Sequence, residues 1–178
     1  MNETKRTIFW MALRHIQAYE NTLCLAKPEE FVNHYWPLII EFDRERILSE
    51  FQVQDHLELI EVLDKSCVRY KLNEESKISD IDFTLIRSAI LYAMNRQTIA
   101  SAMLPDDITQ EYFELMTKEQ KQILSLDLRK NLEQFGFFGD KNIDHPKWMQ
   151  FLLKLENSHK KYIEYLKHPD WTDPSLKL

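Results

Sequence analysis

The chain has 178 residues, of which 44% are hydrophobic and 29% are charged, and its formal net charge is −6. This length and apolar content suit a folded domain with a real core and exclude a disordered tail. Only two glycines and six prolines occur, which excludes collagen-like and glycine-rich phosphate-binding architectures and disfavours a β-sandwich. We therefore expect an all-α fold: a single-domain bundle of about seven to eight helices over residues 1–178, with a candidate subdomain seam near residues 73–79.

The two cysteines and the N-terminus indicate a cytoplasmic protein. Cys24 and Cys67 are too few for a disulfide scaffold or a four-thiolate zinc site, so we interpret them as reduced, buried thiols. Arg14 and His15 interrupt the N-terminal apolar stretch too early for a secretory signal. No run reaches the roughly 20 apolar residues that a membrane-spanning helix needs.

Helical periodicity predicts four elements in the first part of the chain. Apolar residues recur at helical spacing over residues 4–24, and Pro28 with the two acidic residues after it is typical of a helix start. We expect a third helix over residues 37–51. A fourth helix, capped by Asp55, should extend over residues 55–72, with Cys67 on its apolar stripe.

Later helices are marked by capping boxes and prolines. Ser79 with Asp82 predicts a helix that continues through Met94, and Asp106 with Asp107 predicts a short helix after Pro105.

The last two predicted helices are long. Thr117 with Gln120 forms a second capping box, and that helix should end at Gly136. Pro146 opens a final helix whose apolar seam runs from Trp148 to Leu166.

Charge is distributed unevenly along the chain. Residues 41–82 contain twelve acidic and six basic side chains, whereas residues 141–167 carry six lysines. A solvated helix face would produce such runs, but an acidic surface can also attract a basic partner. The candidate partner-binding residues are the acidic side chains least neutralised by their neighbours in sequence: Asp55, Glu58, Glu61, Asp106, Asp107 and Glu111.

No catalytic motif is present, so we expect neither an enzyme nor a metal or cofactor site. The six histidines form no His-Glu-x-x-His or Glu-x-x-His pattern. His159, on the apolar seam, reads as a core residue, and His56 and His145 read as first-turn residues. Cys67 would be a nucleophile only with a nearby base and a lowered pKa, and its apolar stripe predicts burial.

Two aromatic segments could face a partner or the core. The segment 135–140 holds both glycines and three phenylalanines, which suits either exposed anchors or a helix-ending turn that folds back on its helix. Tyr35-Trp36-Pro37 lies between two predicted helices and has the same ambiguity.

The stretch Ile86 to Thr98 resembles a motif of small, uncharacterised phage and mobile-element proteins, in which an aromatic-Ala-Leu-Gly-Arg run ends a helix. Asn95 replaces the glycine of that motif, and Ile99 replaces its aromatic. The likeness extends over about residues 86–150 and implies no activity. It implies a polar set that is either structural or functional: Arg87, Tyr92, Arg96 and Asp127.

By type alone, a small, acidic, helical protein without catalytic motifs resembles the immunity proteins that bacteria hold against nuclease toxins. Our hypothesis is an inhibitor that binds a basic toxin through its acidic surface. The alternatives are a mobile-element protein that binds host machinery, a helical enzyme with an unrecognised site, and a nucleic-acid binder. The last would use Lys147, Lys154, Lys160, Lys161 and Lys167.

Overall fold

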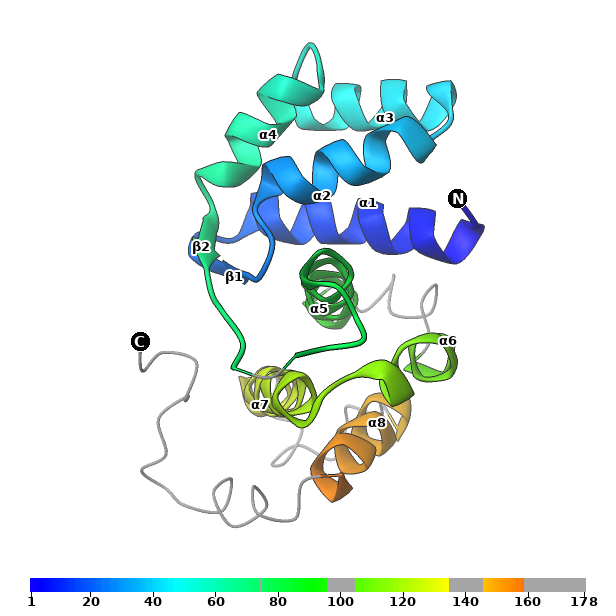
Figure 1. Cartoon of the computed structure of the whole chain (residues 1–178), viewed down its shortest axis with the longest axis vertical. Helices are drawn as coiled ribbons and strands as arrows, with labels where there is room; N and C mark the ends of the chain where they lie inside the picture. Colours follow the sequence, from blue (N-terminus) through cyan, green and yellow to red (C-terminus); the bar gives the residue numbers. More distant parts are fainter. Residues whose placement is uncertain (74, 96–104, 135–145, 159–178) are drawn as a thin grey trace. The chain divides into compact units, whose positions relative to one another are not determined.

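The computed structural model describes residues 1–73, 75–95, 105–134 and 146–158 (Figure 1). These residues form eight α-helices, two short 3-10 helices and a two-stranded parallel sheet, which confirms the all-α class. The described residues divide into two compact units. The first unit holds residues 1–72 and 78–95, and the second unit holds the remainder.

The first unit is built on two crossing helices, α1 and α5. Figure 1 shows α5 end-on beside α1, so the two axes cross steeply. Every residue of α5 from Phe83 to Met94 is buried, as expected for a helix that is apolar on most of its faces. The elements of this unit are α1 (Glu3–Ala18), β1 (Thr22–Cys24), α2 (Pro28–Tyr35), η1 (Trp36–Leu38), α3 (Glu41–Phe51), α4 (His56–Asp64), β2 (Cys67–Arg69) and α5 (Asp80–Asn95).

Two short strands correct the predicted helix ends. The first helix ends at Ala18 instead of residue 24, and the fourth ends at Asp64 instead of residue 72. Asn21 adopts a left-handed φ of 59°, a conformation that asparagine tolerates, and this turns the chain from α1 into β1. Strands β1 and β2 then pair in parallel across more than 40 residues, a partnership that local periodicity cannot reveal.

Helix starts in the first unit follow capping chemistry. Asp55 Oδ1 accepts from the backbone N of Leu57 at 2.8 Å and of Glu58 at 3.0 Å, which confirms the predicted cap of α4. Ser79 Oγ accepts from Asp82 N at 3.1 Å, so the predicted cap of α5 is also confirmed. The third helix begins at Glu41 and not at residue 37, because residues 36–38 form the 3-10 helix η1.

The second unit contains α6 (Pro105–Glu111), η2 (Phe113–Leu115), α7 (Lys118–Gln134) and α8 (Pro146–Asn157). The capping box of α7 is confirmed: Gln120 N donates to Thr117 Oγ1 at 3.1 Å, and Thr117 N donates to Gln120 Oε1 at 3.0 Å. Helix α8 begins at the predicted proline. The aromatic segment 135–140, His145, His159 and the final helix beyond residue 158 lie outside the described residues.

Candidate protein-binding surface

The six predicted acidic residues divide between the two units. The N-cap Asp55 and the α4 residues Glu58 and Glu61 belong to the first unit. Asp106, Asp107 and Glu111 belong to α6 in the second unit, where the two aspartates are exposed and Glu111 is half-buried. Each set is therefore a surface of its own unit.

Two of the three residues at α4 also support the helix start. Asp55 accepts the two amides of the cap, and Glu58 Oε2 accepts from Gln54 N at 2.7 Å. Glu61 is exposed and has no ion-pair partner among the described residues. Substitution of Asp55 or Glu58 would consequently disturb the helix as well as the surface charge, whereas Glu61 reports on charge alone.

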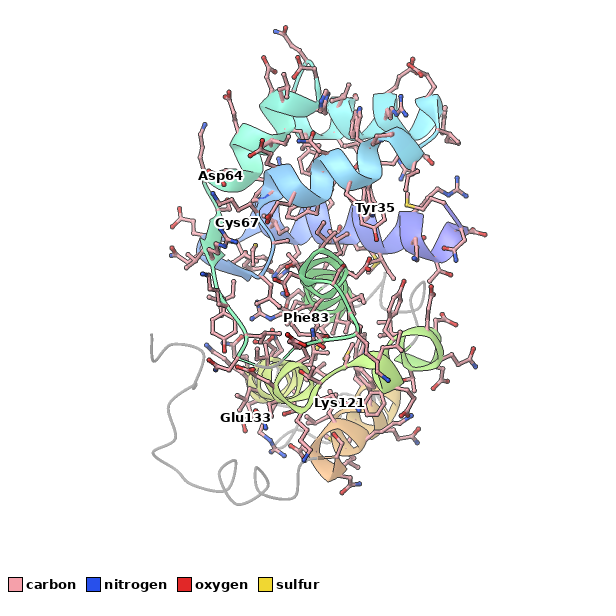
Figure 2. All side chains as sticks on the ribbon, in the orientation of Figure 1. Tyr35, Asp64, Cys67, Phe83, Lys121 and Glu133 are labelled. Atoms are coloured by element: carbon pink, nitrogen blue, oxygen red, sulfur yellow. The ribbon has the colours of Figure 1, made fainter. Side chains whose placement is uncertain are left out.

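Sequence analysis missed part of the exposed face of α4. Leu57, Glu61 and Asp64 are all exposed, and their spacing of four and three residues places them on one side of the helix. Asp64 is the last residue of α4, three residues before the start of β2 (Figure 2). Among the described residues, Asp64 also has no salt-bridge partner.

Large apolar side chains are exposed on α4 and in the segment 38–42. Phe42 is 69% exposed and Leu57 is 58% exposed. Leu38 and Ile40, which precede α3, are about half exposed. The rings of Trp36 and His56 stack with centroids 5.7 Å apart, which brings η1 to the start of α4.

We call the exposed side chains of this region the α3–α4 surface: Leu38, Ile40, Phe42, Glu45, Leu57, Glu61 and Asp64. Helices α3 and α4 lie on the side of the first unit opposite α5 (Figure 1). The alternation of Leu38, Ile40 and Phe42 was the available sequence signal, since so many apolar residues so close together exceed what one buried helix stripe accommodates. Phe42 belongs to the apolar pattern that predicts the third helix, and the structure leaves it exposed.

In the segment Tyr35-Trp36-Pro37, the two aromatic side chains pack mainly within their own unit. Tyr35 is buried and its hydroxyl donates to an Asp82 carboxylate oxygen. Trp36 is half-buried under the His56 ring. The anchors available to a partner are therefore the apolar residues after Trp36, and not the tyrosine and tryptophan themselves.

The charge of α3 is neutralised on its side facing α1. Asp43 pairs with Arg6 at 3.2 Å, and Glu50 lies 3.6 Å from both Arg14 and Arg46. Glu50 also accepts from the Trp10 indole N–H at 2.7 Å. Residues 41–64 contain eight acidic and two basic side chains, so this pairing leaves the outward-facing carboxylates as the source of a local negative field.

A cavity of about 200 Å³ lies between α1 and α3. Its lining includes Arg6, Trp10, Asp43 and Arg46. The guanidinium groups that line it already have carboxylate partners in Asp43 and Glu50, and the Arg46 guanidinium lies over the Trp10 ring. These contacts make the cavity part of the α1–α3 packing.

Within the described ranges, no group of three or more His, Cys, Asp or Glu side chains could hold a metal ion. Cys67 lies on β2 and not on the apolar stripe of α4, and it is only partly buried. The hydrogen bond with Cys24, followed by burial, raises the pKa of the Cys67 thiol, which lowers the fraction present as thiolate.

The polar set implied by the resemblance is described for three of its four residues. Arg87 is buried and its Nη1 donates to the carbonyl O of Leu23 at 2.7 Å. Tyr92 is buried and packs edge-on against Trp10. Asp127 belongs to α7 in the second unit, and Arg96 lies outside the described residues.

The lysine-rich region is described only in part. The Lys154 ammonium sits 4.5 Å from the centre of the Phe113 ring, and Lys121 approaches the same ring at 4.2 Å. These cation–π contacts tie the lysine side chains to their own unit. Side chains of Lys147, Lys160, Lys161 and Lys167 lie outside the described residues.

No family model, curated protein or solved structure matches this chain. None of the described helices is long and apolar enough to cross a bilayer. The chain is therefore described by its fold and its surface. It is a helical protein whose α3–α4 surface combines exposed carboxylates with exposed apolar side chains.

Proposed function

We propose that this protein is an inhibitor that binds a basic protein, of the kind represented by nuclease toxins, through the α3–α4 surface. The observation that carries the proposal is the combination of Phe42 and Leu57, both more than half exposed, with carboxylates that have no ion-pair partner among the described residues. Apolar anchors supply binding energy, and surrounding charges supply association rate and specificity.

Each component has a distinct expected role. Exposure of a phenylalanine ring to water is unfavourable in the free protein. Burial of the ring by a partner removes this unfavourable hydration and so contributes binding free energy. Glu61 and Asp64 attract a positively charged partner before contact. A nuclease binds phosphates through basic side chains, so carboxylates placed against that site would exclude its substrate.

The test uses the full chain, tagged and co-expressed with the product of the gene immediately upstream. We expect a stoichiometric complex with a basic protein whose nuclease activity is blocked. Association and dissociation rates are then measured at two salt concentrations. Electrostatic steering predicts that association slows as salt increases.

Three variants separate charge from apolar contact. The pair Glu61→Lys with Asp64→Lys should slow association at least about tenfold, whereas Phe42→Ser should mainly speed dissociation. Glu20→Lys is the matched charge control, since Glu20 is exposed in the same unit outside the α3–α4 surface and should leave both rates unchanged. If the paired reversal behaves like the Glu20 control, the surface is wrongly placed.

The α6 set is a second candidate surface, because Asp106 and Asp107 are exposed. Asp106→Lys in the same kinetic assay tests it. Binding of a host protein in place of the upstream product would overturn the inhibitor proposal and favour a mobile-element protein that acts on host machinery.

A further inference from the structure

The two cysteines, 43 residues apart in the chain, meet on the small parallel sheet. In the ladder Thr22 is the partner of Cys67, and Arg69 is the partner of Cys24. Residues two apart on a strand share a face, so Cys24 and Cys67 are diagonal neighbours on one face of the sheet. Their Sγ atoms lie 2.7 Å apart.

The backbone holds this arrangement from both ends of the ladder. Thr22 N donates to the carbonyl O of Ser66 at 2.8 Å, and Tyr70 N donates to the carbonyl O of Cys24 at 2.9 Å. Diagonal neighbours in a sheet are about 7–8 Å apart at Cα, somewhat more than the roughly 4.4–6.8 Å of most disulfides, so closure would draw the two strands together. The two side chains point at each other. Their Sγ atoms are 2.7 Å apart, compared with about 2.05 Å in a disulfide bond.

We propose that Cys24 and Cys67 are a redox-active pair that closes to an intramolecular disulfide, with a small disulfide such as oxidised glutathione as the oxidant. This proposal replaces the interpretation of the two cysteines as reduced, buried thiols. It is independent of the α3–α4 surface and of any partner.

The order of the two steps follows from exposure. Cys67 is partly exposed, whereas Cys24 is 1% exposed. Cys67 therefore loses its proton first and attacks one sulfur of oxidised glutathione, which forms a mixed disulfide and releases one glutathione thiolate. Cys24 then loses its proton and attacks Sγ of Cys67, and the second glutathione leaves. Two cysteine thiols give up two electrons and two protons, and the oxidant becomes two glutathione molecules.

The bond would tie together the chain on both sides of α2, α3 and α4. Cys24 lies four residues before α2. Cys67 lies three residues after α4 (Figure 2). Closure converts this part of the first unit into a covalent loop, which restricts the unfolded chain more than the folded one.

The test equilibrates the full-length protein with glutathione buffers of defined thiol-to-disulfide ratio. After trapping with a maleimide, intact mass spectrometry separates the dithiol, the mixed disulfide and the intramolecular disulfide. The same equilibrium is measured in guanidinium chloride, where nothing holds the two cysteines together. We expect the equilibrium constant for closure to be at least about 100-fold larger in the folded protein.

Two variants identify the steps. Cys24→Ser should stop at the mixed disulfide on Cys67, and Cys67→Ser should resist oxidation. Equal closure constants in folded and denatured protein, a wild type that stops at the mixed disulfide, or disulfide-linked dimers would each overturn the proposal. The closure constants of folded and denatured wild type test the proposal even where a variant fails to fold.

Discussion

Arg129 on α7 and Glu156 on α8 form an ion pair inside the second unit, with Nε of Arg129 donating to Oε1 of Glu156 at 2.8 Å. An Nη2 group of the same arginine reaches the same oxygen. Glu156 is only 5% exposed. Its negative charge is therefore stabilised by the Arg129 guanidinium in place of water.

Removal of this carboxylate should strongly destabilise the protein. Glu156→Ala leaves a partly buried guanidinium without its main partner, and we expect a loss of about 3 kcal/mol in the free energy of unfolding. Urea unfolding followed by circular dichroism measures it. Glu133→Ala is the matched control, because Glu133 is 3.9 Å from the same arginine and 47% exposed, and it should cost no more than about 0.5 kcal/mol. Equal losses in the two variants would contradict the prediction that the buried Arg129–Glu156 ion pair stabilises the protein more than Glu133 does.

A second prediction concerns the buried hydroxyl of Thr84. Its Oγ1 accepts from the backbone N of Leu25 at 2.9 Å and of Ala26 at 3.0 Å, and the residue is 1% exposed. Thr84→Val keeps the shape but leaves two amides without an acceptor, so the free energy of unfolding should fall by at least about 2 kcal/mol.

Thr84→Ser provides the comparison, since it keeps the acceptor and loses one methyl group. We expect it to cost about 1 kcal/mol. A serine variant less stable than the valine variant would show that packing, and not the hydrogen bonds, dominates at this position.

Stability should also depend on pH through His15. Burial, and next the positive charge of Arg87, lower the pKa of His15 from 6.5 to about 4. Between these two pKa values His15 is protonated in the unfolded chain and neutral in the folded protein. The free energy of unfolding therefore falls as the pH decreases from about 6.5 towards 4. The full effect amounts to about 3 kcal/mol.

The measurement is the free energy of unfolding of the wild type and His15→Gln between pH 7 and pH 4.5. The variant should lose less stability than the wild type over this range. Parallel curves would mean that His15 titrates alike in the folded and unfolded states.

Oxidation of the cysteine pair should raise thermal stability. A bridge between residues 43 apart is expected to add about 2–4 kcal/mol to the free energy of unfolding. The melting temperature of oxidised protein should drop when a reductant is added, and that of Cys67→Ser should not respond. An oxidised protein that melts below the reduced one would indicate a strained bridge.

Local chemistry explains which elements could be predicted. The cap at Asp55 and the capping box of Thr117 and Gln120 need only residues within three positions of one another, and both are present. The proline starts of α2 and α8 are equally local.

Features that depend on distant partners could not be predicted in this way. Cys67 has helical spacing with the apolar residues of α4, yet it pairs with Thr22 on a strand, because the β-ladder competes with the helix only once the two segments meet. Phe42 is as apolar as the buried Ile47 and Phe51 of α3, and the packing of distant segments decides that it is exposed while they are not.

The all-α class, the helix starts marked by caps or prolines, and the concentration of negative charge in residues 41–82 can be predicted from sequence, since they follow from composition and from contacts a few residues apart. The folded chain shows which carboxylates are neutralised by arginines of α1, which apolar residues stay exposed, and that the two cysteines face each other. Those outcomes depend on contacts between segments tens of residues apart, whose pairing is set by packing of the whole unit and not by any local pattern.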